Sequence, residues 1–207
     1  ALVNTGRIQA AEFINQGQAY RAVYFQNDYY TAEGKSVRKA FLRSPIEFSR
    51  ISSGFSNSRF HPVLNQWRAH KGVDFAAPIG TKVKATSDGV VFSFGKQGGY
   101  GNFVPISHQG RFTTVYGHLS RFAKGLHRGQ RVAQSDVIAY VGMTGMTSGP
   151  HLHYEFKIDG QQRDPLRVAL PDAQPVNAAN KAAFQSVADN FVARLNLLRN
   201  TNLAKLD

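Results

Sequence analysis

The chain of 207 residues contains no cysteine. This absence excludes thiol catalysis, disulfide bonds and any metal site built on thiolates. There is also no run of about 18 or more apolar residues, so the sequence predicts no membrane-spanning segment. The chain begins ALVNTGRIQA, without methionine and without a charged and then apolar leader. We interpret it as a mature or trimmed fragment from which a signal peptide has been removed.

Acidic residues are missing from one long stretch, residues 89–135, although the whole chain has a formal net charge of +12. The cations of this stretch are Lys96, Arg111, Arg121, Lys124, Arg128 and Arg131. Such a segment attracts polyanions at low salt. A solvated basic surface, an anionic membrane, nucleic acid or a polymer rich in carboxylates would each explain it. No RNP-type motif is present, and the aromatic residues alternate within apparent strands, so nucleic acid is not the expected partner.

The pattern of residues divides the chain into three parts. Short alternating runs such as AYRAVYF, with a turn at residues 15–18, predict a small β subdomain over residues 1–48. Residues 49–170 contain many short strand patterns separated by glycine turns, which predicts an antiparallel, mainly β domain. Residues 171–207 form a tail in which apolar residues recur at helical spacing over 178–199. The apolar stripe of that helix is expected to be a packing face.

The stretch GPHLHYE places two histidines two residues apart. The following HLHYEFKI has strand character, and residues i and i+2 of a strand lie on one face. His151 and His153 are therefore expected to point the same way, with Leu152 and Tyr154 on the opposite side. Two neighbouring imidazoles resist being charged together, so a shared cation or a role in proton transfer would explain the pair.

A second cluster, RAHKGVDFAAPIG, contains His70 and Asp74. Gly72 and Pro78 argue against a helix here, but an even offset also places both side chains on one face of an extended segment. Two histidines, one aspartate and an open position form the usual layout of a catalytic zinc site, and there is no cysteine to close it.

Further histidines lie outside these two clusters. His118, in RFTTVYGHLS between a strand and a turn, is a candidate for proton transfer or for binding an oxyanion. His61 lies nine residues before His70, where it could line the same cleft, and it is left out of the ligand set. His108 and His127 are expected on the surface.

The segments HKGVDFAAPIGTKVKATSDGVV, YGNFVPISHQGRFTTVYGHLS and VGMTGMTSGPHLHYEFKIDG resemble the lysostaphin/LytM-type zinc metallopeptidases, the M23 family. The resemblance covers residues 51–168, and the segments before it resemble the region that precedes the catalytic domain in Gram-negative murein DD-endopeptidases. It implies a LytM-type β domain in which His70, Asp74 and His153 bind one Zn²⁺ per chain. It also implies that His118 and His151 are catalytic histidines that do not bind the metal, and which of them is the base stays open.

The resemblance further implies hydrolysis of peptide cross-links between the peptide stems of peptidoglycan, of the D-Ala–meso-diaminopimelate type. That polymer is rich in carboxylates, which gives the basic chain a partner other than nucleic acid. Such a substrate implies action in the periplasm or cell envelope. The alternative is a non-enzymatic LytM-type regulator that activates a separate amidase, but such regulators typically lack the metal ligands.

Overall fold

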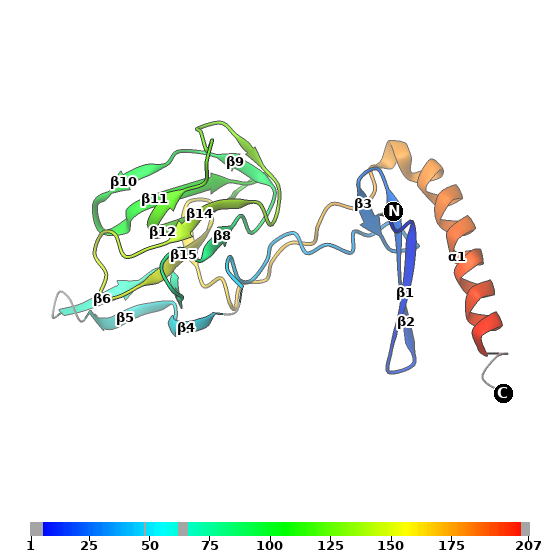
Figure 1. The fold of residues 1–207 in the computed structure, drawn as a ribbon, viewed down its shortest axis with the longest axis horizontal. Helices are drawn as coiled ribbons and strands as arrows, with labels where there is room; N and C mark the ends of the chain where they lie inside the picture. Colours follow the sequence, from blue (N-terminus) through cyan, green and yellow to red (C-terminus); the bar gives the residue numbers. More distant parts are fainter. Residues whose placement is uncertain (1–5, 48, 62–65, 204–207) are drawn as a thin grey trace, which may run out of the picture. The chain divides into compact units, whose positions relative to one another are not determined.

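The computed structural model describes residues 6–47, 49–61 and 66–203, without the side chains of 59–61, 66–68 and 200–203. The chain divides into two compact units (Figure 1). Phe41–Leu170 form the first, here called the central unit. Ala1–Ala40 and Pro171–Asp207 form the second, the terminal unit. The division into three domains at 48/49 and 170/171 remains a prediction, but the first strands and the C-terminal helix pack together.

The terminal unit consists of a small antiparallel sheet and a helix. Its elements are β1 (Ala10–Asn15), β2 (Gln18–Phe25), β3 (Asp28–Tyr30), the 3₁₀ turn η2 (Ala178–Asn180) and α1 (Lys181–Leu203). Gln16 and Gly17 connect β1 to β2 with φ of 49° and 78°, the positive values that a two-residue hairpin turn requires. Phe184 and Ala188 of α1 are buried against Val23 of β2. The predicted helix and its packing face are therefore present.

Among the described residues, no helix combines enough length with enough apolar character to cross a bilayer.

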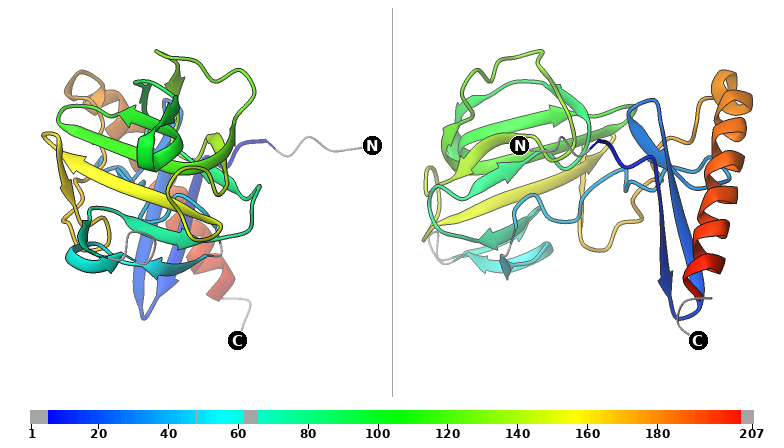
Figure 2. Two further views of the ribbon diagram at one scale, coloured as in Figure 1. Left: turned by 90° about the vertical axis from the view of Figure 1, so that its left-hand side faces the viewer. Right: turned by 45° about the vertical axis from the view of Figure 1, so that its right-hand side comes forward.

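The central unit consists of short antiparallel strands. They are β4 (Arg50–Ser53), β5 (Ser56–His61), β6 (Gln66–His70), β7 (Val73–Ala76), β8 (Lys82–Lys84), β9 (Gly89–Val91), β10 (Gly95–Gln97), β11 (Gly101–Ser107), β12 (Phe112–Phe122), β13 (Arg131–Val132), β14 (Val137–Val141), β15 (His151–Ile158) and β16 (Gln161–Arg163), with a 3₁₀ turn η1 (Gly98–Tyr100). The main sheet has the order β13-β9-β11-β12-β15-β7-β4, and β5 and β6 pair in a separate two-stranded sheet. Figure 2 shows the central unit from two further sides. The predicted fold class, mainly β with a small N-terminal sheet and a C-terminal helix, is confirmed.

The apolar core of the central unit lies against β11, β12 and β15. Val104, Tyr116, Leu119, Leu152 and Tyr154 are each at most 1% exposed. Leu152 and Tyr154 thus fill the core side of β15, as the alternation of the HLHYEFKI segment predicts. The other face of β15 is free to carry the two histidines.

His108 was expected on the surface, and that expectation is wrong. Its side chain is buried, with Nδ1 2.8 Å from the carbonyl oxygen of Asp88 and Nε2 2.8 Å from Oγ1 of Thr114. The ring of Phe41 packs edge-on against it. These partners come from separate segments, so the sequence around His108 gives no sign of them. His127 is exposed, as predicted.

Candidate metal centre and catalytic cleft

Pairing between β7 and β15 brings two candidate ligands together. In this antiparallel pair, His153 stands directly opposite Asp74. His70 ends β6, and Gly72 lies in the short connection to β7. A Cβ atom on Gly72 would lie 2.5 Å from Cε1 of His153, so only glycine allows the chain to pass this close to the imidazole.

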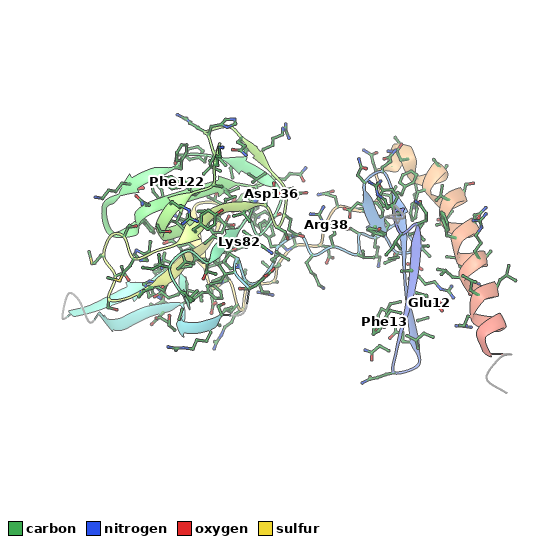
Figure 3. The ribbon with its side chains drawn as sticks, viewed as in Figure 1. Glu12, Phe13, Arg38, Lys82, Phe122 and Asp136 are labelled. Atoms are coloured by element: carbon green, nitrogen blue, oxygen red, sulfur yellow. The ribbon has the colours of Figure 1, made fainter. Side chains whose placement is uncertain are left out.

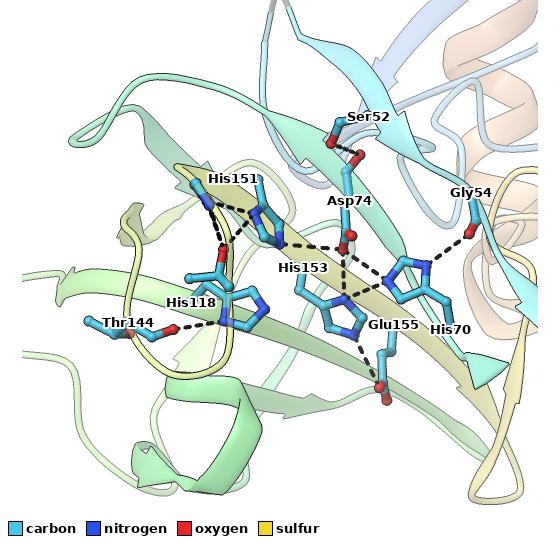
Figure 4. A network of polar contacts seen from close by, with 11 residues as sticks. Ser52, Gly54, His70, Asp74, His118, Thr144, His151, His153 and Glu155 are labelled. Atoms are coloured by element: carbon cyan, nitrogen blue, oxygen red, sulfur yellow. Dashed lines mark hydrogen bonds and ion pairs between the residues drawn. The ribbon is translucent and has the colours of Figure 1, made fainter. Parts of the chain in front are cut away.

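The three predicted ligands converge on one point (Figure 4). Oδ1 of Asp74 lies 3.0 Å from Nε2 of His70 and 2.8 Å from Nδ1 of His153. The two imidazole nitrogens are 3.2 Å apart. Donor atoms about 2.1 Å from a tetrahedral zinc ion would be about 3.4 Å apart, so a small widening of this cluster would fit such an ion.

The opposite nitrogen of each imidazole has its own acceptor. Nδ1 of His70 donates to the carbonyl oxygen of Gly54 at 2.8 Å. Nε2 of His153 faces Oε1 of Glu155 at 3.3 Å. A proton held on these outer nitrogens leaves the lone pairs of His70 Nε2 and His153 Nδ1 directed at the centre, as metal binding requires.

The electrostatics of the cluster favour a cation. Burial alone would raise the pKa of Asp74, but hydrogen bonds with His153 and His70 hold it well below its usual range. Burial likewise opposes protonation of His153, yet Asp74 and Glu155 raise its pKa to about 9. A buried carboxylate that recruits positive charge this strongly, beside two oriented imidazoles, is a donor set that fits a divalent metal.

His118 and His151 flank this cluster. His118, on β12, has φ of +59°, a conformation that is uncommon for residues with a side chain and is found at functional sites. Its Nδ1 donates to the carbonyl oxygen of Thr144 at 2.8 Å. Its ring meets the ring of His151 edge-on at 4.7 Å between centroids.

His151 is oriented in a similar way. Its Nδ1 lies 2.9 Å from the carbonyl oxygen of Gly149, while Nε2 lies 3.6 Å from Oδ1 of Asp74. With Nδ1 occupied by a carbonyl in both residues, His118 and His151 both have Nε2 available for chemistry. Burial lowers the pKa of His118 to about 4, so its imidazole is neutral near pH 7 and can accept a proton.

All five predicted residues line one cleft of about 480 Å³. The floor and walls also include Tyr100, Met146, Thr147 and Glu155. The prediction that His61 could line the same cleft falls outside the described side chains. The spatial grouping of the five residues is therefore as expected, and their individual chemical roles remain proposals.

Sequence reasoning missed Glu155, the buried carboxylate behind His153. Tyr100 donates to its Oε1 at 2.6 Å, and Nζ of Lys157 lies 3.1 Å from its Oε2. Burial would raise the pKa of Glu155, but hydrogen bonds with His153 and Tyr100 lower it to about 2, so it is a charged acceptor. A signal was available, because Glu155 follows His153 by two positions on one strand and therefore shares its face.

Comparison with known proteins agrees with this geometry. Residues 68–165 match Peptidase family M23. The chain is 41% identical over 197 residues to peptidoglycan DD-endopeptidase ShyC of Vibrio cholerae, an alignment that covers 94% of this chain and 45% of ShyC. The chain thus spans about half the length of the curated relatives it matches.

Solved structures show the same fold. A zinc-containing peptidase from Vibrio cholerae has a TM-score of 0.60 and 34% identity, covering 80% of this chain and 51% of that one. The catalytic domain of lysostaphin from Staphylococcus simulans has a TM-score of 0.51 and 28% identity, covering 57% of this chain and 90% of that domain. Together with the cluster of His70, Asp74 and His153, these matches show that the chain belongs to peptidase family M23.

Proposed function

We propose that this chain is a zinc-dependent endopeptidase that hydrolyses peptide cross-links of peptidoglycan during cell-wall remodelling. The observation that carries the proposal is the meeting of three ligand atoms beside two further histidines whose Nδ1 atoms are held by backbone carbonyls. The names of relatives such as ShyC support peptidoglycan as the substrate. We further propose that the bond is D-Ala–meso-diaminopimelate and that the site of action is the periplasm or cell envelope.

His70, Asp74 and His153 would hold the zinc ion, one per chain. Bound zinc supplies Lewis-acid chemistry, which makes a water more acidic and polarises the carbonyl group to be cleaved. Because the chain offers three ligands, one position stays open for water or substrate. The carbonyl of Gly54 and the carboxylate of Glu155 keep the two ligand imidazoles in the required tautomer.

The two flanking histidines have separate roles. Neutral His118 accepts a proton at Nε2 from the attacking water, since its Nδ1 is already committed to Thr144, and passes that proton to the amine nitrogen as the C–N bond breaks. His151 has its Nε2 3.6 Å from Oδ1 of Asp74, beside the three ligand atoms, and it stabilises the developing oxyanion. In this assignment His118 is the general base and His151 is the electrostatic stabiliser.

The alternative is a LytM-type regulator that activates an amidase without catalysing a reaction itself. Nothing in such a role requires three converging ligand atoms with fixed tautomers, and this chain has them. The ligand set therefore favours the enzyme.

Mass analysis of muropeptides released from purified Gram-negative sacculi tests the proposal. We expect the zinc-loaded protein to convert cross-linked dimers to monomers with new D-Ala carboxyl ends. A chelator should stop the reaction, and added zinc should restore it. Dimers that stay intact with protein shown to contain one zinc per chain would contradict the enzymatic function, and cleavage at another bond would contradict the D-Ala–meso-diaminopimelate assignment.

A further inference from the structure

One surface of the central unit has no part in the cleft. It is formed by residues 91–94 and 122–131, here called the Phe–Arg surface. Backbone hydrogen bonds and ring contacts hold the two segments side by side. The amide of Gly129 donates to the carbonyl of Val91 at 2.9 Å, the guanidinium of Arg128 lies 6.0 Å from the ring centroid of Phe92, and the rings of Phe94 and Phe122 meet edge-on at 5.1 Å. Phe122, labelled in Figure 3, is the last residue of β12.

The Phe–Arg surface combines exposed aromatic rings with uncompensated positive charge. Phe92 is 60% exposed and Phe94 is 40% exposed. The exposed cations Lys124, Arg128 and Arg131 come from the neighbouring segment. Rings left in water beside cations are typical of a surface that binds a partner.

The positive charge of the Phe–Arg surface is not balanced from within the chain. Among the described side chains, no carboxylate forms an ion pair with Lys124, Arg128 or Arg131. Elsewhere in the same unit, Arg111 pairs with Asp159 and Lys84 pairs with Glu47. The missing negative charge therefore has to come from solvent ions or from an acidic partner.

Two strands connect this surface to the cleft. Phe122 lies four residues beyond His118 on β12, a distance of about 13 Å at about 3.3 Å per residue. Phe94 leads through β10 into Gly99 and Tyr100, which line the cleft. The Phe–Arg surface therefore adjoins strands that also carry residues of the cleft.

We propose that the Phe–Arg surface is an accessory docking site for the carboxylate-bearing wall polymer, outside the catalytic cleft. This inference rests on the proposed function. Carboxylates of the peptide stems match Lys124, Arg128 and Arg131, and apolar faces of the polymer pack on Phe92 and Phe94. An anionic membrane would satisfy the charges too, but proximity to the cleft favours the polymer that the cleft cleaves.

The test compares two double variants of the full chain. Phe92→Ser with Arg128→Ser removes a ring and a cation from the Phe–Arg surface. Ile79→Ser with Lys82→Ser is the matched control, because Ile79 is 59% exposed and Lys82 is an exposed cation of the same unit. Binding is measured by co-sedimentation with purified sacculi in the presence of a chelator, which prevents digestion, and with vesicles containing anionic phospholipid. Cleavage is measured separately on a soluble muropeptide dimer.

We expect the Phe92/Arg128 variant to bind sacculi about five- to tenfold more weakly, with a smaller dependence on salt, while the control binds normally. Cleavage of the soluble dimer should match the unmodified chain, since no residue of the cleft has changed. Equal binding of both variants to sacculi would overturn the proposal. So would a loss confined to the vesicles, which would assign the surface to a membrane. Failure of the unmodified chain to cut the dimer would instead count against the proposed function.

Discussion

The central and terminal units differ in what they bury. In the central unit, the buried side chains include His70, Asp74, His118, His153 and Glu155. In the described part of the terminal unit, the buried side chains are apolar, such as Val23, Phe184 and Ala188, while Phe13, labelled in Figure 3, is 67% exposed. Burial of polar groups is costly unless each has a partner. The buried polar side chains are therefore found in the central unit, where a large sheet can supply their partners. The described part of the terminal unit buries apolar side chains, which pack against one another.

The largest expected effect comes from removing a ligand in the central unit. Asp74→Ala deletes the oxygen shared by His70 and His153, so we expect zinc content to fall to background and dimer cleavage to drop by at least about 10³-fold. Elemental analysis and muropeptide assays measure the two effects. Asp136→Ala, which changes an exposed carboxylate of the same unit, is the control. Wild-type zinc affinity in Asp74→Ala would refute the ligand assignment.

His118→Ala separates proton transfer from metal binding. Because His118 contacts the cleft through Nε2 and is not among the three ligands, we expect kcat to fall by about 10²–10⁴-fold with zinc content unchanged. The φ of +59° makes alanine unfavourable, so His118→Asn, which tolerates that conformation, is measured beside it. His127→Ala, at an exposed position, serves as the control. Full activity in both His118 variants would exclude it as the base.

The sequence predicts some features of the metal-binding and proton-transfer residues better than others. Period-two alternation predicts that His151 and His153 share a face and that Leu152 faces the core, because successive side chains of a strand point to opposite faces. The even offset of His70 and Asp74 predicts convergence without specifying the distance. The M23-like segments predict which residues belong together, although they lie on strands far apart in the chain.

Other features depend on pairing that the sequence does not encode locally. Tyr100 reaches Glu155 only because β11 and β15 both pair with β12. The positive φ of His118 lies at a register shift between β11 and β12, where Asn102 pairs with Leu119 and Val104 with Tyr116, and only the pairing of the two strands reveals that shift. His108 was misplaced for the same reason, since its partners Asp88 and Thr114 are brought to it by the sheet.

A smaller effect on zinc binding is expected from changing Glu155, the carboxylate that faces Nε2 of the ligand His153. Glu155→Gln keeps the volume but removes the charge that holds the Nε2 proton of His153, so we expect zinc affinity to weaken by about 10–100-fold. Competition with a chromogenic chelator measures it. Tyr100→Phe, which removes one donor to Glu155, should weaken the affinity less. Unchanged affinity in Glu155→Gln would mean that the carboxylate only fills space.

The smallest effect on the metal centre should come from the terminal unit. Phe184→Ala removes the ring that packs on Phe25 and Tyr30, which should cost about 3–5 kcal/mol of the stability of that unit. Hydrogen exchange should speed up in β1 and β2, while zinc affinity stays the same. A parallel fall in zinc affinity would show that metal binding in the central unit depends on packing in the terminal unit, contrary to this prediction.

The most direct measurement is a crystal structure of the zinc-loaded protein with anomalous data at the zinc edge. The account predicts one strong peak about 2.0–2.2 Å from Nε2 of His70, Oδ1 of Asp74 and Nδ1 of His153, with the nearest atoms of His118 and His151 outside bonding distance. A peak bound through His118 or His151 in place of one of these ligands, or no peak in this cluster, would contradict it.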